Sequence, residues 1–250
     1  MTARPDILAV IPARGGSKSV PRKNLKILGG RPLIVHSIDA ARQSQLITRV
    51  IVSTDDDEIA DVARRFGAEV PFIRPAELAR DDTPDFPVFR HALEWLEREE
   101  RYRPELVVQL RPTAPMRRVD TIDRAVAALL ARPEMDSLRA VSLAKETPFK
   151  MWFIGASGEL QPVVTLPGVG EAYNMPRQSL PKAYWQNGYI DISRPATIQA
   201  GSMTGTRILS FVVDEPCVEI DYEEHFAAAE RMFAGGGLEV PASATDRFPS

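Results

Sequence analysis

The sequence has little that could cross-link it or bind zinc. Its single cysteine, Cys217, cannot form an internal disulfide, and its three histidines, His36, His91 and His225, do not have the spacing of zinc ligands. A chain without disulfides is typical of a reducing compartment, so we expect a cytoplasmic protein.

The chain also lacks a strong net charge and a long hydrophobic run. Its formal net charge is -3, which does not favour a nucleic-acid partner. The N-terminal apolar run "ILAVIPA" is too short to span a bilayer, and a basic loop follows it instead of a cleavage site with small residues. We therefore expect a soluble protein that binds neither nucleic acid nor a membrane.

Apolar runs and helical patterns alternate through the first half of the chain. The runs at 7–13, 49–54, 70–75 and 105–110 predict buried strands, and the segments at 32–45, 55–67 and from about 84 onward have helical periodicity. This alternation predicts an α/β domain with a mainly parallel sheet. Its ligand site should lie beyond the carboxyl ends of the strands.

The alternation breaks between about 142 and 192, where we predict an inserted lobe. The stretch "MWFIGASGELQPVV" within it predicts a hairpin around its two glycines. A further strand in "RILSFVVD" and a helix from about 223 to 233 return to the core, and residues 235–250 contain too few apolar side chains to pack. We predict that these last residues form a disordered tail.

The stretch "IPARGGSKSVPRKN", residues 11–24, places a basic loop directly after the first predicted strand. Gly15 and Gly16 allow backbone N–H groups to approach phosphate oxygens, and Ser17 adds a donor. The spacing matches neither the P-loop nor the dinucleotide-binding fingerprint. No Asp or Glu lies between residues 7 and 38, and the bases there are Arg14, Lys18, Arg22, Lys23, Lys26 and Arg31. A polyanionic ligand explains this pattern; a hydrated basic turn is the alternative.

Five segments in this order resemble the acylneuraminate cytidylyltransferase (CMP-sialic acid synthetase) family. They are "IPARGGSKSVPRKN", "VIVSTDDDEIADVARRFGAEVPFIRPAEL", "RPTAP", "PRQSLPKAYWQNGYIDI" and "VEIDYEE". The resemblance implies a Rossmann-like nucleotide-diphospho-sugar transferase fold over residues 1–234, with a dimerisation lobe and a homodimer as the working form. It also implies transfer of CMP from CTP to a 2-keto-3-deoxy sugar acid.

The resemblance extends to individual residues that would bind the nucleotide. It implies that the basic loop binds the triphosphate and favours departure of pyrophosphate, that Asn24 lies near the cytosine or ribose, and that Arg74 contacts the nucleotide. Ser19 stands where the family usually has glycine. The implied nucleotide-binding residues are Arg14, Gly15, Gly16, Ser17, Lys18, Lys23, Asn24 and Arg74, and the implied catalytic residues are Arg14, Lys23 and Asp221.

The family also binds Mg²⁺ through two acids that are one residue apart at the end of the last core strand. Here these are Glu219 and Asp221, and the period of a strand would direct both to one side. Glu219 departs from the aspartate of many members. The run Asp55–Asp57 is a competing metal candidate, although acids at this position also suit an N-cap at Thr54 or Asp55.

The acceptor side departs most from the family pattern. Arg111 in "RPTAP" stands where sialate-specific relatives carry glutamine. It either pairs with a carboxylate or another substituent of the acceptor, which would favour an acceptor other than N-acetylneuraminate, or pairs with a neighbouring acid. The other residues that the resemblance places near the acceptor are Lys150, Arg177, Gln178, Tyr184 and Asn187.

Other functions remain open at this stage. The same fold could serve a pyrophosphorylase that uses another nucleotide and a sugar 1-phosphate, or a catalytically silent nucleotide-binding regulator. The general base is not identified by the sequence: a metal-bound water and Asp221 are both candidates. His91 lies in a predicted helix, where a packing role fits better.

Overall fold

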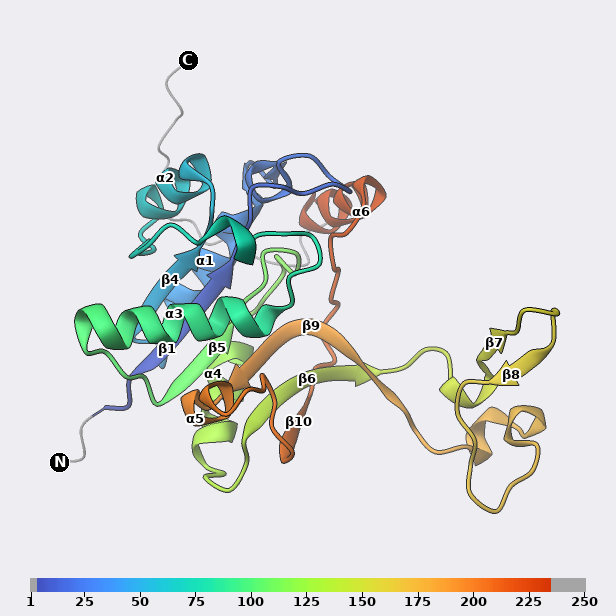
Figure 1. The fold of residues 1–250 in the computed structure, drawn as a ribbon. Coiled ribbons are helices and arrows are strands. Elements are labelled where there is room, and N and C mark those ends of the chain that lie inside the picture. Colours follow the sequence, from blue (N-terminus) through green and yellow to red (C-terminus); the bar gives the residue numbers. More distant parts are fainter. Residues whose placement is uncertain (1–3, 235–250) are drawn as a thin grey trace.

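The computed structural model describes residues 4–234, which form an α/β fold around one mixed sheet (Figure 1). The strand order is β10-β6-β9-β5-β1-β4, with β9 antiparallel to both of its neighbours and the other pairs parallel. The mainly parallel α/β prediction is confirmed. The strands are β1 (Ile7–Pro12), β4 (Arg49–Ser53), β5 (Leu106–Gln109), β6 (Ser137–Leu143), β9 (Tyr184–Ser193) and β10 (Ile208–Val212).

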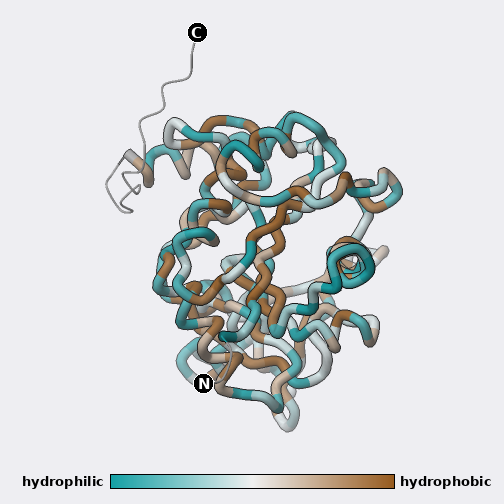
Figure 2. The backbone as a smooth tube through the Cα atoms, turned by 90° about the vertical axis from the view of Figure 1, so that its left-hand side faces the viewer, coloured by the Kyte–Doolittle hydropathy of each residue, from teal (hydrophilic) through white to brown (hydrophobic). Residues whose placement is uncertain are grey.

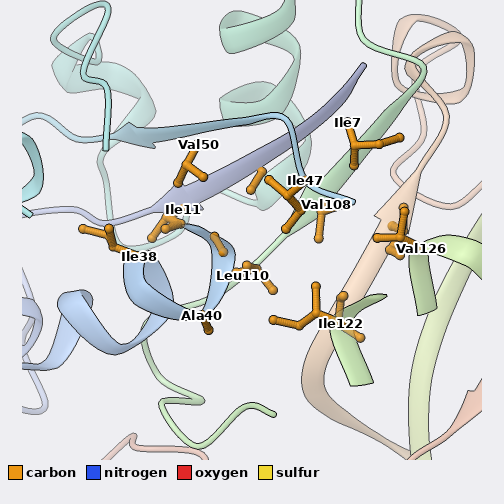
Figure 3. Close-up of a cluster of buried hydrophobic side chains, with 14 of the residues drawn as sticks. Ile7, Ile11, Ile38, Ala40, Ile47, Val50, Val108, Leu110, Ile122 and Val126 are labelled. Atoms are coloured by element: carbon orange, nitrogen blue, oxygen red, sulfur yellow. The ribbon is translucent and has the colours of Figure 1, made fainter. Parts of the chain in front are cut away.

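The two faces of the sheet carry separate hydrophobic cores. Ile11 of β1 packs with Ile38 of α1 and Ile122 of α4 (Figure 3). Val10 points to the other face, as the strand period requires, and packs with Phe89 of α3. In Figure 2 the strongly hydrophobic stretches run through the interior of the body. The helices are α1 (Leu33–Gln43), α2 (Asp57–Arg65), α3 (Asp85–Glu100), α4 (Val119–Leu130), α5 (Pro195–Gln199) and α6 (Glu223–Ala234).

Two local results differ from the sequence predictions. Residues 70–75 do not form a strand; only the isolated bridges Ile51↔Glu69 and Thr54↔Ile73 connect this region to the edge strand β4. Pro71 supplies no N–H to a ladder, which prevents regular pairing. Helix α4 and strand β6 were not predicted from the sequence. The predicted tail at 235–250 lies outside the described residues.

The inserted lobe projects from the sheet on two long strands (Figure 1). β6 and β9 stay paired as far as Leu143 and Tyr184, so the segment that leaves the sheet is 144–183, shorter than the predicted 142–192. The predicted hairpin is present as β7 (Trp152–Ile154) and β8 (Leu160–Pro162). Three of its large apolar side chains are exposed: Phe153, Ile154 and Leu160. The lobe therefore presents an apolar surface to solvent.

No helix within residues 4–234 is both long enough and apolar enough to cross a bilayer.

Candidate active site

A cavity of about 590 Å³ lies at the carboxyl ends of β1 and β5. Its wall comes from the loops after these strands, from the segment before α3 and from Asp221 near the C-terminus. The site is where an open α/β sheet was predicted to bind its ligand. Six basic and three acidic side chains line it: Arg14, Lys18, Lys23, Arg74, Arg80 and Arg111, against Asp81, Asp85 and Asp221.

The bases of the N-terminal segment divide into two groups. Arg14, Lys18 and Lys23 line the cavity, together with Ser17 and Asn24. The other bases pair with acids elsewhere: Arg22 with Asp56 and Glu58, Lys26 with Glu223, and Arg31 with Asp39. Three of the six bases therefore line the cavity, and the other three are paired with acids outside it.

The two glycines of the basic loop do not line the cavity. The N–H of Gly15 donates to Oδ1 of Asp55 at 3.0 Å, and a Cβ at this position would lie 2.5 Å from Oδ2 of Asp56. Neither Gly15 nor Gly16 has a positive φ. Gly15 is thus required for close packing of the loop against the start of α2, and its N–H is already engaged instead of being directed at a phosphate.

The acidic run anchors this loop and caps a helix. Asp56 is the N-cap of α2, in place of the predicted Thr54 or Asp55, and its carboxylate accepts from the N–H of Ile59 at 3.0 Å. The donors Arg22 and Ile59 lower the pKa of Asp56 although burial opposes them. Within residues 4–234 no three His, Cys, Asp or Glu side chains gather as a metal cluster. Metal binding by Asp55–Asp57 stays a prediction.

Arg74 is a buried guanidinium in the cavity wall, and its residue is only 5% exposed. Its Nε and Nη2 have no hydrogen-bond partner in the described chain, and Nη2 lies 3.8 Å from Oδ1 of Asp55. Burial lowers the pKa of Arg74. Its Nη1 donates to the carbonyl of Leu78 at 3.4 Å. Unpaired buried donors are costly, so contact of Arg74 with the nucleotide stays a prediction that this geometry favours.

Lys23 connects the basic loop to the C-terminal acids. Its Nζ donates to the carbonyl of Ile220 at 2.9 Å and lies 3.6 Å from Oδ1 of Asp221. The predicted strand end is wrong here, because β10 ends at Val212 and residues 214–222 are irregular. Pro216 lies in this segment and cannot donate to a ladder.

Glu219 lies beside Asp221 but does not line the cavity. A Cβ at Gly188 would be 3.2 Å from its Oε1, so Glu219 packs against the middle of β9. Burial, and then the negative charge of Asp221, raise the pKa of Glu219. Both side chains are carboxylates, the kind of oxygen donor that Mg²⁺ prefers in proteins.

Helix α6 holds these acids against the basic loop. Lys26 pairs with Glu223, and its Nζ lies 4.6 Å from the ring centroid of Phe226. The N–H of Gly29 donates to Glu230 at 3.0 Å. The cavity thus joins residues that are almost 200 positions apart in the sequence.

Arg111 lines the cavity and is held by two carboxylates. Its Nη2 donates to Oδ2 of Asp85 at 2.8 Å and its Nη1 to Oδ2 of Asp191 at 3.0 Å. Although burial opposes it, the two acids raise the pKa of Arg111, so the side chain stays charged. Of the two interpretations of Arg111, pairing with a neighbouring acid is confirmed, and contact with an acceptor stays a prediction.

The remaining predicted acceptor residues do not reach this cavity. Lys150, Arg177 and Gln178 belong to the lobe, where the last two line a separate hollow of about 420 Å³. Tyr184 is exposed at the start of β9. Asn187 is fully buried, donates to Oγ of Ser142 and accepts from the N–H of Tyr189, so it supports the chain inside the sheet. None of the five lines the same chain's cavity.

The segment that leads into α3 was not predicted as part of the site, and it supplies Arg80, Asp81, Thr83 and the first helical residue, Asp85, to the cavity wall. Asp81 pairs with Arg14 at 2.8 Å and also with Lys18. The dense polar run "ARDDTPD" between Arg74 and a helix was the available signal. His91, by contrast, packs edge-on against Phe72 and does not line the cavity.

Arg117 was also missed, and it organises the loop after β5. It is buried and donates only to neutral groups, including the carbonyls of Arg111 and Tyr189 and Oγ of Ser37. Burial lowers the pKa of Arg117 to about 10. Its bonds tie the end of β5 to β9 and so fix the backbone that carries Arg111.

Three comparisons show what the chain is similar to. Residues 8–151 match a family model described as "Cytidylyltransferase". The CMP-N,N'-diacetyllegionaminic acid synthase of Campylobacter jejuni is 34% identical over 92% of this chain and 95% of its own length. A protein of the same name from Legionella pneumophila is 44% identical, but the match spans 48% of this chain and only 51% of that relative. A solved CMP:2-keto-3-deoxy-manno-octonic acid synthetase complexed with CTP superposes with a TM-score of 0.68, 18% identity and coverage of 92% and 99%, which supports the fold.

Proposed function

Because this chain belongs to the cytidylyltransferase family, we propose that it transfers CMP from CTP to a 2-keto-3-deoxy sugar acid related to sialic acid. The observation that carries the proposal is the cavity at the carboxyl ends of the strands, which is lined by Arg14, Lys18 and Lys23 and by Arg74 with its unpaired donors. Guanidinium and ammonium groups at this position suit the oxygens of a triphosphate.

In the proposed reaction, the anomeric hydroxyl oxygen of the sugar acid forms a bond to the α-phosphorus of CTP. The bond from that phosphorus to the bridging oxygen breaks, and pyrophosphate leaves with the bond's electron pair. The hydroxyl proton is lost to solvent or a base. Lys23 and Lys18 would stabilise the charge that develops on the leaving group, because fixed positive charges at that point lower the barrier.

Asp221 and Glu219 would hold Mg²⁺, which when bound would neutralise phosphate charge. The donor chemistry fits, since both side chains offer carboxylate oxygens and only one residue separates them in the chain. Asp221 also lines the cavity, whereas Glu219 lies behind it. We therefore propose that Asp221 is the principal protein ligand.

The acceptor is proposed to be a sugar acid other than N-acetylneuraminate. Two of the similar proteins are named for N,N'-diacetyllegionaminic acid. Arg111, in place of the glutamine of sialate-specific relatives, also supports a different acceptor contact.

This function is testable by incubating the protein with Mg²⁺, each common nucleoside triphosphate, and either keto-sugar acids or sugar 1-phosphates. We expect pyrophosphate release and a CMP-sugar mass only with CTP and a keto-sugar acid. Equal use of other nucleotides, or turnover of a sugar 1-phosphate, would instead establish a pyrophosphorylase. CTP binding without any product across the panel would indicate a silent nucleotide-binding protein.

We also propose that the working form is a homodimer in which the lobe of one chain completes the acceptor site of the other. Lys150, Arg177 and Gln178 lie on a lobe that projects away from the body, outside their own chain's cavity (Figure 1). The exposed Phe153, Ile154 and Leu160 make this lobe suited to pairing with a second copy.

Mixing two defective variants tests this arrangement. Lys23→Ala damages the cavity and Arg177→Ala damages the lobe, so each alone should have low activity. After the subunits are mixed and exchanged, a heterodimer would contain one site with neither change, and activity should recover to about a quarter of wild type. The absence of recovery, despite demonstrated subunit exchange, would show that the lobe acts on its own chain or not at all.

A further inference from the structure

A polar row crosses the sheet from the cavity toward the lobe. Gln109 of β5, Asp191 of β9 and Arg139 of β6 are directly opposite one another in register. Directly opposite residues share a face of the sheet, so the three side chains lie in one row. Gln109 donates to Asp85 of the cavity wall at 2.8 Å, which joins the row to the nucleotide side.

Asp191 occupies the centre of this row and bridges two arginines. Its side chain is 7% exposed, with Oδ2 accepting from Nη1 of Arg111 at 3.0 Å and Oδ1 accepting from Nε of Arg139 at 3.2 Å. Gln186 also donates to Oδ2 at 3.3 Å. Because one carboxylate bonds to both guanidinium groups, it fixes the distance and orientation between them.

The stability of the fold does not account for this arrangement. Buried ion pairs repay their desolvation poorly, and apolar side chains of similar volume are often as stabilising. Asp191 offers one negative charge to two positive ones, and the second acid, Asp85, pairs with Arg111. The two carboxylates therefore balance the two guanidinium groups, but Arg111 contacts both acids whereas Arg139 contacts only Asp191.

Arg139 retains the capacity to bind a ligand. Its side chain is 30% exposed, its Nη1 donates to Oε1 of the exposed Gln186 at 3.0 Å, and its Nη2 has no partner among residues 4–234. Arg111, in comparison, has both terminal nitrogens engaged by carboxylates. Arg139 is thus the member of the pair that can donate to a new oxygen.

We propose that Arg139 is a specificity-determining residue that donates to an oxygen of the acceptor, and that Asp191 is a positioning residue that holds it beside Arg111. The inference rests on the proposed function, since a hydroxyl that attacks CTP in the cavity places its sugar next to Arg111. Arg139 is outside the cavity lining, so the acceptor would have to extend past Arg111 to reach it. The ligand chemistry is an anionic or carbonyl oxygen, either the carboxylate of the sugar acid or the carbonyl of an acylamino group.

The test compares wild type, Arg139→Ala, Arg139→Lys and Asp191→Asn with CTP and two keto-sugar acids, one carrying acetamido groups and one carrying only hydroxyls. We expect the acceptor KM of Arg139→Ala to rise about tenfold or more, with the CTP KM unchanged and partial recovery in Arg139→Lys. Asp191→Asn should raise the same constant and also lower the Tm, because it leaves two guanidinium groups without a shared carboxylate, so its kinetics are measured well below its own Tm. The Arg139→Ala/Asp191→Asn double variant should raise the acceptor KM by less than the product of the two single effects. Arg207→Ala, which breaks the exposed pair with Asp136, is the control.

The results show which acceptor oxygen Arg139 contacts, and they distinguish failure of this inference from failure of the proposed function. A higher KM of Arg139→Ala for both acceptors identifies the carboxylate as the contacted group. A higher KM for the acetamido sugar alone identifies the carbonyl. Unchanged acceptor KM values in an active Arg139→Ala enzyme would overturn this inference alone. A wild-type protein that forms no CMP-sugar would overturn the proposed function, and this inference with it.

Discussion

Replacement of Lys23 by alanine is expected to lower kcat by at least roughly tenfold, and by as much as a thousandfold, as losses of fixed charge from transition states commonly do. The Nζ of Lys23 faces the cavity and lies 3.6 Å from Asp221, with the side chain 13% exposed. Its charge is thus partly desolvated, where electrostatic interactions are strongest. Steady-state pyrophosphate release at saturating CTP and acceptor measures the effect.

Arg22 provides a matched control for this prediction. It precedes Lys23 and carries the same charge, but it pairs with Asp56 and Glu58 outside the cavity. Its φ of 54° lies in the left-handed region, so Arg22→Asn is preferable to alanine. This variant should retain most of its activity, and Tm measurements should show that both variants fold. Wild-type kinetics in Lys23→Ala would remove Lys23 from the reaction.

The second large effect is expected for Asp221→Asn. This change removes a charge from the cavity wall and leaves the shape of the side chain almost intact. We expect kcat to fall by about a hundredfold and the Mg²⁺ concentration for half-maximal activity to rise, because a neutral amide binds a divalent cation weakly. A Mg²⁺ titration of initial rates, with chelator-treated protein as the starting point, measures both changes.

Two neighbouring acids, Glu224 and Glu219, provide comparison variants for Asp221→Asn. Glu224, an exposed acid in the first turn of α6, should be replaceable by glutamine without loss of activity. Glu219→Gln should have a smaller effect than Asp221→Asn, because Glu219 does not line the cavity. Full activity of Asp221→Asn at an unchanged Mg²⁺ requirement would contradict the assignment.

The N-terminal half of the chain shows which elements can be predicted from residues that are adjacent in sequence. The apolar run of β1 and the amphipathic pattern of α2 were both predicted, since each depends on residues adjacent in the chain. The central antiparallel strand β9 was not predicted as part of the sheet, because its partners β5 and β6 lie far from it in sequence. The sequence pattern there indicated only a returning segment.

In the basic loop, too, the local sequence predicted the excess of positive charge but not the partner of each base. Its position after β1 and its excess of positive charge are local properties, and they correctly placed Arg14, Lys18 and Lys23 beside the cavity. Nothing local distinguished these bases from Arg22 and Lys26, which pair with distant acids. The partners come from loops that only the folded chain brings together.

The sequence by itself thus determined the type of fold, the basic loop and the acids near the C-terminus, because hydrophobic period, turn residues and charge are written in neighbouring positions. Only the tertiary structure decided that Arg111 is held by Asp85 and Asp191, that Asp191 joins it to Arg139, and that the lobe lies outside its own chain's cavity. These relations depend on strand pairing and loop closure across long separations, which no pattern of adjacent residues specifies.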